Sequence, residues 1–303
     1  MEKNTYIRFD WAAKYMLRDK ANFDVLEGLI SVLTGEDVKI EEILEGEGNQ
    51  TAGDDKFNRV DIKARNAAGE IIIVEIQQTR ELHYLQRILY GVAKTISEHM
   101  RLGRSYAEVK KVYSVSIVYF DLGQGKDYIY HGQTRFVGLN TGDTLRITSR
   151  EKDAVCMKAP EEVFPDYFII RVNEYNKPVA DNFLEEWLGY LKDGYISEDT
   201  KAPGLQEARR KLNYLSMSQK ERAQYESHLD AVMTQNDVLE SAKLEGRAEG
   251  RAEGRAEGRE EGRAEERFVI ADKMLAKGLP PETVSEITGI TVEELKGHGD
   301  RFR

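Results

Sequence analysis

Two carboxylates and an amide stand where a short β-hairpin would bring them together. The stretch RVDIKARNAAGEIIIVEIQQ has Asp61 before a turn, and Glu75 and Gln77 after it. In a hairpin, the residue numbers of each cross-strand pair add up to the same sum, so a turn near residue 68 places Asp61 opposite Glu75. The Cβ atoms of such a pair lie about 4.5–5.5 Å apart. Gln77 lies on the same face as Glu75, because side chains alternate along a strand. With the carbonyl of Ile76, these groups form an oxygen-rich cluster that suits Mg²⁺ or Mn²⁺.

The residues alone allow two interpretations of this cluster. Two carboxylates so close repel each other unless a cation lies between them or one keeps its proton. The hairpin could instead be an exposed edge with one polar face, since Asp followed later by Glu-x-Gln is a short and common pattern. The uninterrupted run IIIV before Glu75 favours the metal site, because such a run indicates a strand that is covered on both faces.

The segments around the hairpin alternate between helical and extended patterns. Apolar residues at helical spacing predict helices over residues 23–35 and 81–103, the second with an apolar stripe of Leu82, Leu85, Ile88, Leu89, Val92 and Ile96. Runs of β-branched and aromatic residues predict strands over 111–120, 123–138, 142–150 and 166–175, of which the middle two would form a hairpin pair. The alternation indicates an α/β protein.

The pattern resembles the PD-(D/E)XK superfamily, whose signature is an Asp on one strand and an acid-x-Lys on the next. More closely, the chain resembles the Rpn family of recombination-promoting nucleases, also described as transposases. The stretches that carry this likeness are FDWAAKYMLRDKANFDVLEGL, DKFNRVDIKARNAAGEIIIVEIQQ, RILYGVAKTISEHMRLGRSY, KKVYSVSIVYFDLGQGKDYIYHG and the EGRAEGRAEG tail. The resemblance implies a restriction-endonuclease-like α/β fold, in which helices flank a mixed sheet and a helical extension follows at the C-terminus.

The resemblance also implies a function and a set of catalytic residues. The chain would be a metal-dependent DNA endonuclease, linked to recombination, mobile elements or defence, and Mg²⁺ or Mn²⁺ would activate the attacking water. Asp61, Glu75 and the Ile76 carbonyl would bind the metal. Gln77 stands where the superfamily more often has Lys, and it can orient a water but brings no charge. Glu27 matches the superfamily's third acid, although it could also be an ordinary helix residue.

Other residues are candidates for binding the substrate or for supporting the site. Contacts to phosphates, which position DNA without reading its sequence, are predicted for Arg87, Tyr90, Lys110 and Lys111. Asp10 and Lys14 match the family's N-terminal pattern, which a plain helix-start pair explains equally well. Glu45 and Glu47, in a glycine-rich loop, are weaker candidates for the site.

Composition restricts the class of protein. The chain has 303 residues and a formal net charge of −10, which argues against broad electrostatic binding to nucleic acid and leaves room only for local basic patches. Its single cysteine, Cys156, excludes an internal disulfide framework and is typical of the reducing cytoplasm. The N-terminal residues have no apolar core, so we expect no signal peptide. No apolar run is long enough to span a membrane.

The chain is expected to divide into four parts: a nuclease domain over 1–200, a helical connector over 201–240, a charged helix or linker over 241–267 and a small helical tail over 268–303. The third part repeats the four residues GRAE. Its i,i+4 pairs join like charges, and each glycine costs about 1 kcal/mol in a helix interior. Such a helix would gain from a partner, so we expect a homo-oligomer, with a flexible charged linker as the alternative.

The tail hints at a helix-turn-helix, with Thr291 and Glu294 as a capping box for its last helix. Glu293 and Glu294 would bring negative charge towards phosphates, so a packing or protein-binding module is the favoured interpretation. A second function from another class also fits the sequence. The nuclease fold could be catalytically silent and act as a binding or scaffold protein through its charged repeat helix.

Overall fold

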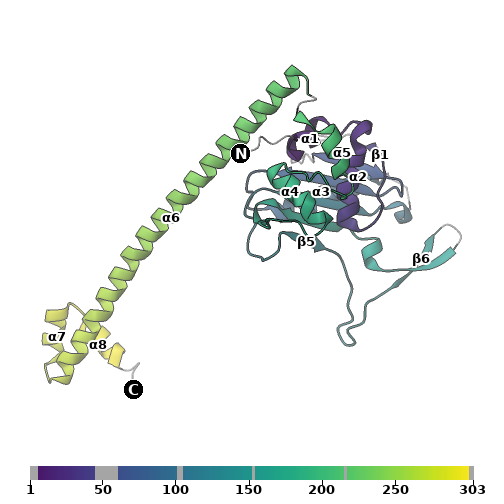
Figure 1. Cartoon of the computed structure of the whole chain (residues 1–303). Helices are drawn as coiled ribbons and strands as arrows, with labels where there is room; N and C mark the ends of the chain where they lie inside the picture. The colour runs from purple at the N-terminus through teal and green to yellow at the C-terminus, as the bar shows by residue number, and fades with distance from the viewer. Residues whose placement is uncertain (1–5, 45–60, 101–104, 152–153, 215–216, 300–303) are drawn as a thin grey trace, which may run out of the picture. The chain divides into compact units, whose positions relative to one another are not determined.

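The computed structural model describes residues 6–44, 61–100, 105–151, 154–214 and 217–299 (Figure 1). The chain divides into two compact units, Met1–His228 and Leu229–Arg303. Among the described residues, no helix is both long and apolar enough to cross a lipid bilayer.

The first unit is built on a mixed six-stranded sheet in the order β1-β2-β3-β4-β8-β5. Its strands are β1 (Ile40–Ile43), β2 (Ile62–Asn66), β3 (Ile71–Gln77), β4 (Val112–Val118), β5 (Ile129–Gly132) and β8 (Asp166–Arg171). β3, β4 and β8 are parallel, while β1, β2 and β5 join them in antiparallel pairs. A mixed sheet flanked by helices confirms the predicted restriction-endonuclease-like α/β architecture.

The hairpin of β2 and β3 forms as the sequence predicts. Its turn includes Gly69, whose φ of 78° is in the left-handed region that glycine tolerates. Every residue of β3 from Ile71 to Ile76 is buried. This confirms the expectation that the IIIV run is covered on both faces, because β3 lies inside the sheet with helices over it.

Five helices belong wholly to the described part of this unit: α1 (Phe9–Tyr15), α2 (Phe23–Thr34), α3 (Tyr84–His99), α4 (Phe183–Asp193) and α5 (Leu205–Lys211). Short 3₁₀ turns lie at Lys20–Asn22, Tyr106–Glu108, Pro160–Glu162 and Val172–Glu174. α2 ends as predicted, with Gly35 in the left-handed conformation and its N–H bonded to the Ser31 carbonyl at 2.9 Å. α2 packs against α4 and α5.

The helix predicted over 81–103 forms as α3, and its predicted apolar stripe is confirmed in part, with Ile88 and Val92 buried and Ile96 packed against the core. Tyr84 and Ile88 pack against Val118 and Phe120 on the sheet, and Val92 packs farther along. All three leucines of the predicted stripe face outward, with exposed fractions of 85% for Leu82, 59% for Leu85 and 60% for Leu89. The large ring of Tyr84 takes the buried place at the start of the helix, which turns these leucines away. The predicted end at Gly103 lies outside the described residues.

The predicted hairpin pair over 123–138 and 142–150 forms only next to its turn, where Val137 bridges Thr144, the Gly138 N–H donates to the Asp143 carbonyl at 2.8 Å and the Leu145 N–H donates to the Phe136 carbonyl at 2.9 Å. β5 completes the sheet as its edge strand, antiparallel to β8. β6 (Ile147–Glu151) pairs instead with β7 (Ala154–Lys158), in a separate two-stranded sheet. Pairing with the next segment along the chain closes a shorter loop, which costs less conformational entropy.

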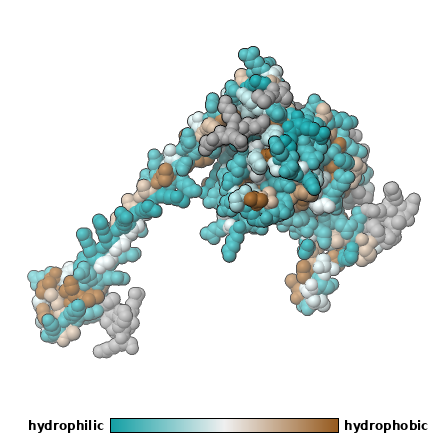
Figure 2. Space-filling model, viewed as in Figure 1, coloured by the Kyte–Doolittle hydropathy of each residue, from teal (hydrophilic) through white to brown (hydrophobic). Residues whose placement is uncertain are grey.

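The second unit continues a long helix, α6 (Gln219–Ala276), and adds α7 (Pro281–Thr288) and α8 (Val292–Gly299). The GRAE repeat lies within α6 and is hydrophilic along its length (Figure 2). A small core of Ala271, Val284, Ile290 and Leu295 joins the last helices. The capping box is confirmed, since the Thr291 N–H donates to Glu294 at 2.9 Å and the Glu294 N–H donates to Thr291 at 3.2 Å.

Candidate active site

The register of the hairpin places Asp61 opposite Glu75. Ile62 pairs with Val74, and the later pairs keep the same sum of residue numbers. Asp61 directly precedes β2, so the same register leads to Glu75 and confirms the predicted pairing. Asp61 Oδ2 accepts a hydrogen bond of 2.7 Å from the Ile76 N–H, which holds this carboxylate across the end of the hairpin.

The backbone of Ile76 turns both of its polar groups towards Asp61. On β3, the backbone N–H and carbonyl of the neighbouring residue Gln77 point towards β4, since this carbonyl accepts the Tyr119 N–H at 3.0 Å. Successive residues of a strand alternate in the side to which their N–H and carbonyl point, and one residue's two groups point to the same side. The Ile76 carbonyl therefore faces the β2 side of the strand, where Asp61 lies.

Glu75 is buried, with only 6% of its surface exposed, and Arg87 of α3 is its counter-ion. An Arg87 Nη2 lies 2.6 Å from Glu75 Oε1, a buried oxygen that accepts no well-aligned hydrogen bond. Burial raises the pKa of Glu75, and the nearby Asp61 charge adds to this, while Arg87 opposes it. The carboxylate is thus held close to a cation but remains costly to ionise.

Cations from the start of the chain lie near Asp61. Arg18 donates to the Asp61 carbonyl at 2.7 Å. Burial raises the pKa of Asp61, although the Ile76 hydrogen bond and the charges of Lys14 and Arg18 act in the opposite direction. Both cations are exposed. Lys14 belongs to the N-terminal pattern noted in the sequence, whereas Arg18 carried no signal of its own.

The oxygen donors here fit a divalent cation. Two carboxylates, from Asp61 and Glu75, and one backbone carbonyl are hard ligands of the kind that Mg²⁺ and Mn²⁺ prefer. Two opposed acids with raised pKa values would both gain from an added positive charge. In the part of the chain that the structure describes, no three His, Cys, Asp or Glu side chains form a metal-binding group, so no third carboxylate joins the pair.

The amide nitrogen of Gln77 is held by contacts with Thr79 and Glu81. Gln77 Nε2 lies 3.2 Å from Glu81 Oε1, 3.2 Å from Thr79 Oγ1 and 3.3 Å from the Thr79 carbonyl. The same Glu81 oxygen lies 2.6 Å from Arg87 Nη1. A continuous chain of contacts therefore runs from Glu75 through Arg87 and Glu81 to Gln77. No pattern in the sequence singled out Glu81.

The structure does not bring Glu27 to this cluster. Glu27 accepts the Ile40 N–H at 2.8 Å and pairs with Lys39 at 3.1 Å. Ile40 pairs with Asn66, at the end of β2 farthest from Asp61. Glu27 thus anchors the edge strand β1 to α2. The weaker candidates Glu45 and Glu47 lie outside the described residues.

The four predicted substrate contacts are spread over different places. Arg87 is taken up by Glu75 and Glu81, and Tyr90 lies on α3 with 39% of its surface exposed. Lys110 and Lys111 precede β4, whereas the end of β4 pairs with the Gln77 end of β3. The Lys111 side chain lies 3.3 Å from the buried Asp166. Neither lysine is brought to the hairpin end that holds the carboxylates.

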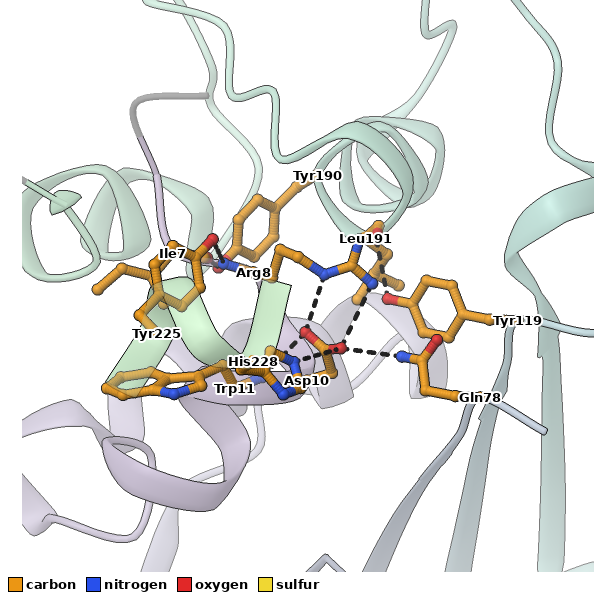
Figure 3. Close-up of polar contacts among 10 residues, drawn as sticks. All are labelled: Ile7, Arg8, Asp10, Trp11, Gln78, Tyr119, Tyr190, Leu191, Tyr225 and His228. Carbon is orange, nitrogen blue, oxygen red and sulfur yellow. Dashed lines mark hydrogen bonds and ion pairs between the residues drawn. The ribbon is translucent and has the colours of Figure 1, made fainter. Parts of the chain in front are cut away.

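Asp10 forms a buried polar cluster just past the end of β3 (Figure 3). Its carboxylate accepts from Gln78 Nε2 at 2.9 Å, His228 Nε2 at 3.1 Å and the Trp11 N–H at 2.9 Å, and it pairs with Arg8 at 3.2 Å. Burial raises the pKa of Asp10, but the hydrogen bond from His228 and the charge of Arg8 outweigh it and lower the pKa to about 2. This cluster joins α1 and the start of α6 to the strand that carries the site.

Two family models match the chain. Residues 7–148 match the PD-(D/E)XK nuclease family transposase, and residues 264–300 match the C-terminal HTH domain of the Rpn/YhgA-like nuclease family. The first match covers the hairpin and α3, and the second covers α7 and α8. The helix-turn-helix hint is thus confirmed, while its role as a packing or protein-binding module stays a prediction. Neither the curated proteins nor the solved structures contain a match.

Proposed function

Because the chain belongs to the Rpn/YhgA-like family of PD-(D/E)XK nucleases, we propose that it is a metal-dependent DNA endonuclease whose active site is the end of the β2–β3 hairpin. One observation carries this proposal. Asp61 and Glu75 occupy opposed positions in a largely buried setting, with the Ile76 backbone beside them. A pair of acids in such a place has little structural use, because burial disfavours both charges.

The proposed cofactor is Mg²⁺ or Mn²⁺, held by Asp61, Glu75 and the Ile76 carbonyl. When bound, the ion would lower the pKa of a water and neutralise charge on the phosphate. The protein's own groups hold this arrangement in place. The Ile76 N–H orients Asp61, and the guanidinium of Arg87 orients Glu75. Gln77 aligns the attacking water, which splits the diester into a phosphomonoester and an alcohol.

We infer that exposed cations guide the phosphate to this site. Lys14 and Arg18 lie beside Asp61 and replace Arg87, Lys110 and Lys111 as the proposed phosphate contacts, while Tyr90 keeps its proposed role. A few local cations are consistent with a chain of net charge −10, which cannot bind DNA over a broad surface. The HTH domain supplies a second region that could contact DNA. The settings we propose are recombination, mobile elements or defence, in the cytoplasm.

The test is cleavage of supercoiled plasmid by the full chain with Mg²⁺, Mn²⁺ or EDTA. We expect nicking that requires metal and falls by about 10²-fold or more in Asp61→Asn and Glu75→Gln, since each removes a charged metal ligand. Glu41→Gln, an exposed acid on β1, is the matched control and should keep full activity. Cleavage that survives both site variants would contradict the assignment. Intact plasmid with folded wild-type protein would favour the scaffold function.

We also propose that α6 mediates homo-oligomerisation. Gly250, Gly254 and Gly258 of its repeat are exposed, and a Cβ atom added at any of them would meet nothing within 4 Å. Small residues permit close approach of a second helix, which could also offset the like-charge pairs along the repeat. Changing these three glycines to Gln raises helix propensity but adds bulk. We expect light scattering to show a smaller assembly for this variant, and an unchanged mass would contradict the proposal.

A further inference from the structure

We propose that Gln77 serves the active site through its amide oxygen, and that Glu81 is the positioning residue that fixes this orientation. The inference rests on the proposed nuclease function. It reverses the polarity expected from the superfamily pattern, in which a Lys at this position donates positive charge and hydrogen bonds. In this chain the same position would present a hydrogen-bond acceptor.

The surroundings of Gln77 determine which way its amide faces. The amide of a Gln side chain can be turned by 180°, and its hydrogen-bond partners decide between the two orientations. The Glu81 carboxylate at 3.2 Å and the Thr79 carbonyl at 3.3 Å can only accept hydrogen bonds. The opposite orientation would set the Gln77 oxygen against these two oxygens. The nitrogen must therefore face Glu81 and Thr79.

Glu81 is itself held in place, which makes the orientation of Gln77 stable. Arg87 Nη1 lies 2.6 Å from the Glu81 oxygen that receives the Gln77 amide, and Arg87 Nη2 lies 2.6 Å from Glu75. The guanidinium is planar and rigid, so it relates the two acids in a fixed geometry. The position of the Gln77 amide is thus coupled to that of the buried Glu75 carboxylate.

This arrangement uses the donors of Gln77 and leaves its acceptor available. Within the described part of the chain, Gln77 Oε1 takes part in no hydrogen bond, and its side chain lies on the same face of β3 as Glu75. The oxygen can accept a hydrogen bond from the attacking water and so direct the water's lone pair. It cannot donate to the phosphate. Positive charge for the phosphate must come from another group, and the exposed Lys14 and Arg18 beside Asp61 are placed to supply it.

The orientation can be tested without measuring activity, by a swap of the two side chains. Gln77→Glu alone sets two carboxylates against each other, so we expect a lower melting temperature. Adding Glu81→Gln restores a donor opposite an acceptor and should recover the loss, apart from the cost of the Arg87–Glu81 ion pair, which the Glu81→Gln single variant measures. Gln86→Glu, an exposed change of the same charge on α3, is the control and should change little. If Gln77→Glu is as stable as the control, or Glu81→Gln does not rescue it, the proposed orientation is wrong.

Cleavage by the same variants tests the role of the oxygen. We expect Gln77→Glu to lose activity and the swapped double variant to recover most of it, because the double variant again presents a fixed oxygen to the site. Gln77→Lys offers only a donor and should lose about 10²-fold in kcat. A Gln77→Lys variant at least as active as wild type would overturn the inference, since a donor would then serve at this position.

The two proposals fail in different ways. If folded wild-type protein does not cleave DNA, the nuclease function fails and the catalytic role of Gln77 fails with it, while the melting temperatures still decide which way its amide faces. If wild type cleaves DNA and the swapped double variant recovers its melting temperature but not its cleavage activity, the nuclease function stands. The proposed role of the Gln77 oxygen as a hydrogen-bond acceptor is then refuted.

Discussion

Arg87 and Glu75 form an ion pair of 2.6 Å that joins α3 to β3, and the same guanidinium pairs with Glu81 at 2.6 Å. From the sequence, Arg87 was predicted to contact the substrate. In the fold, its planar fork is directed to two carboxylates of the protein, one of them buried. Arg87 thus holds the site together, and it offsets negative charge that burial makes costly.

Arg87→Ala should destabilise the protein by about 2 kcal/mol, because it leaves the buried Glu75 without its counter-ion. The loss is moderate because the Arg87 side chain is partly exposed to solvent. Urea denaturation at neutral pH measures this loss. Arg87→Lys keeps the charge but not the fork and should lose less. Arg87 would instead bind substrate if Arg87→Ala unfolds at the same urea concentration as wild type and the salt dependence of its DNA affinity corresponds to about one phosphate contact fewer.

Asp61→Asn should raise stability at neutral pH when no metal is present. Burial raises the pKa of Asp61 in the folded state above its ordinary value of 3.8. Asp61 therefore stabilises the fold below pH 3.8, and this stabilisation is lost as the pH rises through the folded-state pKa. Asn keeps an oxygen for the Ile76 N–H without the charge. The gain in melting temperature should therefore appear at pH 7 and vanish near pH 3. A melting temperature at pH 7 that is lower for Asp61→Asn than for wild type would contradict this prediction.

Metal should stabilise the wild-type protein and not the site variants. A ligand that binds only the folded state raises the melting temperature as its concentration exceeds the dissociation constant. We expect Mn²⁺ to raise the melting temperature of wild type, and EDTA to reverse the effect, with no such shift in Glu75→Gln. Equal shifts in both proteins would place the bound metal elsewhere.

Asp10→Asn should show a stability loss that depends on pH. The pKa of Asp10 is lowered from 3.8 to about 2, so its charge adds about 2 kcal/mol above pH 4, and this is lost as pH falls towards 2. The variant should therefore unfold at lower urea than wild type at pH 7, and the gap should narrow at pH 3. Asp237→Asn, an exposed acid on α6, is the control. A gap that stays constant with pH would show that the lost hydrogen bonds, not the charge, are responsible.

Gly28→Ala should be strongly destabilising. A Cβ atom at Gly28 on α2 would lie 2.3 Å from the backbone of Gly204, which cannot move aside as a flexible side chain could. The expected cost is about 3 kcal/mol or more. Gly189→Ala on α4, where nothing lies within 4 Å, should instead gain up to about 1 kcal/mol. Similar melting temperatures for the two variants would contradict the close approach.

Local features could be read from the sequence with good accuracy. The Gly69 turn determines which residues of the hairpin oppose each other, so Asp61 and Glu75 followed from residue number alone. The IIIV run revealed a strand covered on both faces, and Gly35 revealed where α2 ends. Each of these depends on interactions between residues close in the chain, for which spacing is sufficient information.

Tertiary packing decided the rest. Whether α3 buries Tyr84 or its leucines depends on which stripe fits the sheet, and this selected Arg87 as the partner of Glu75. The place of Glu27 depended on where the edge strand β1 docks. Asp10 meets His228 across 218 positions of sequence. No spacing rule predicts such a contact, because a long-range pair forms only when the whole core brings two distant segments together.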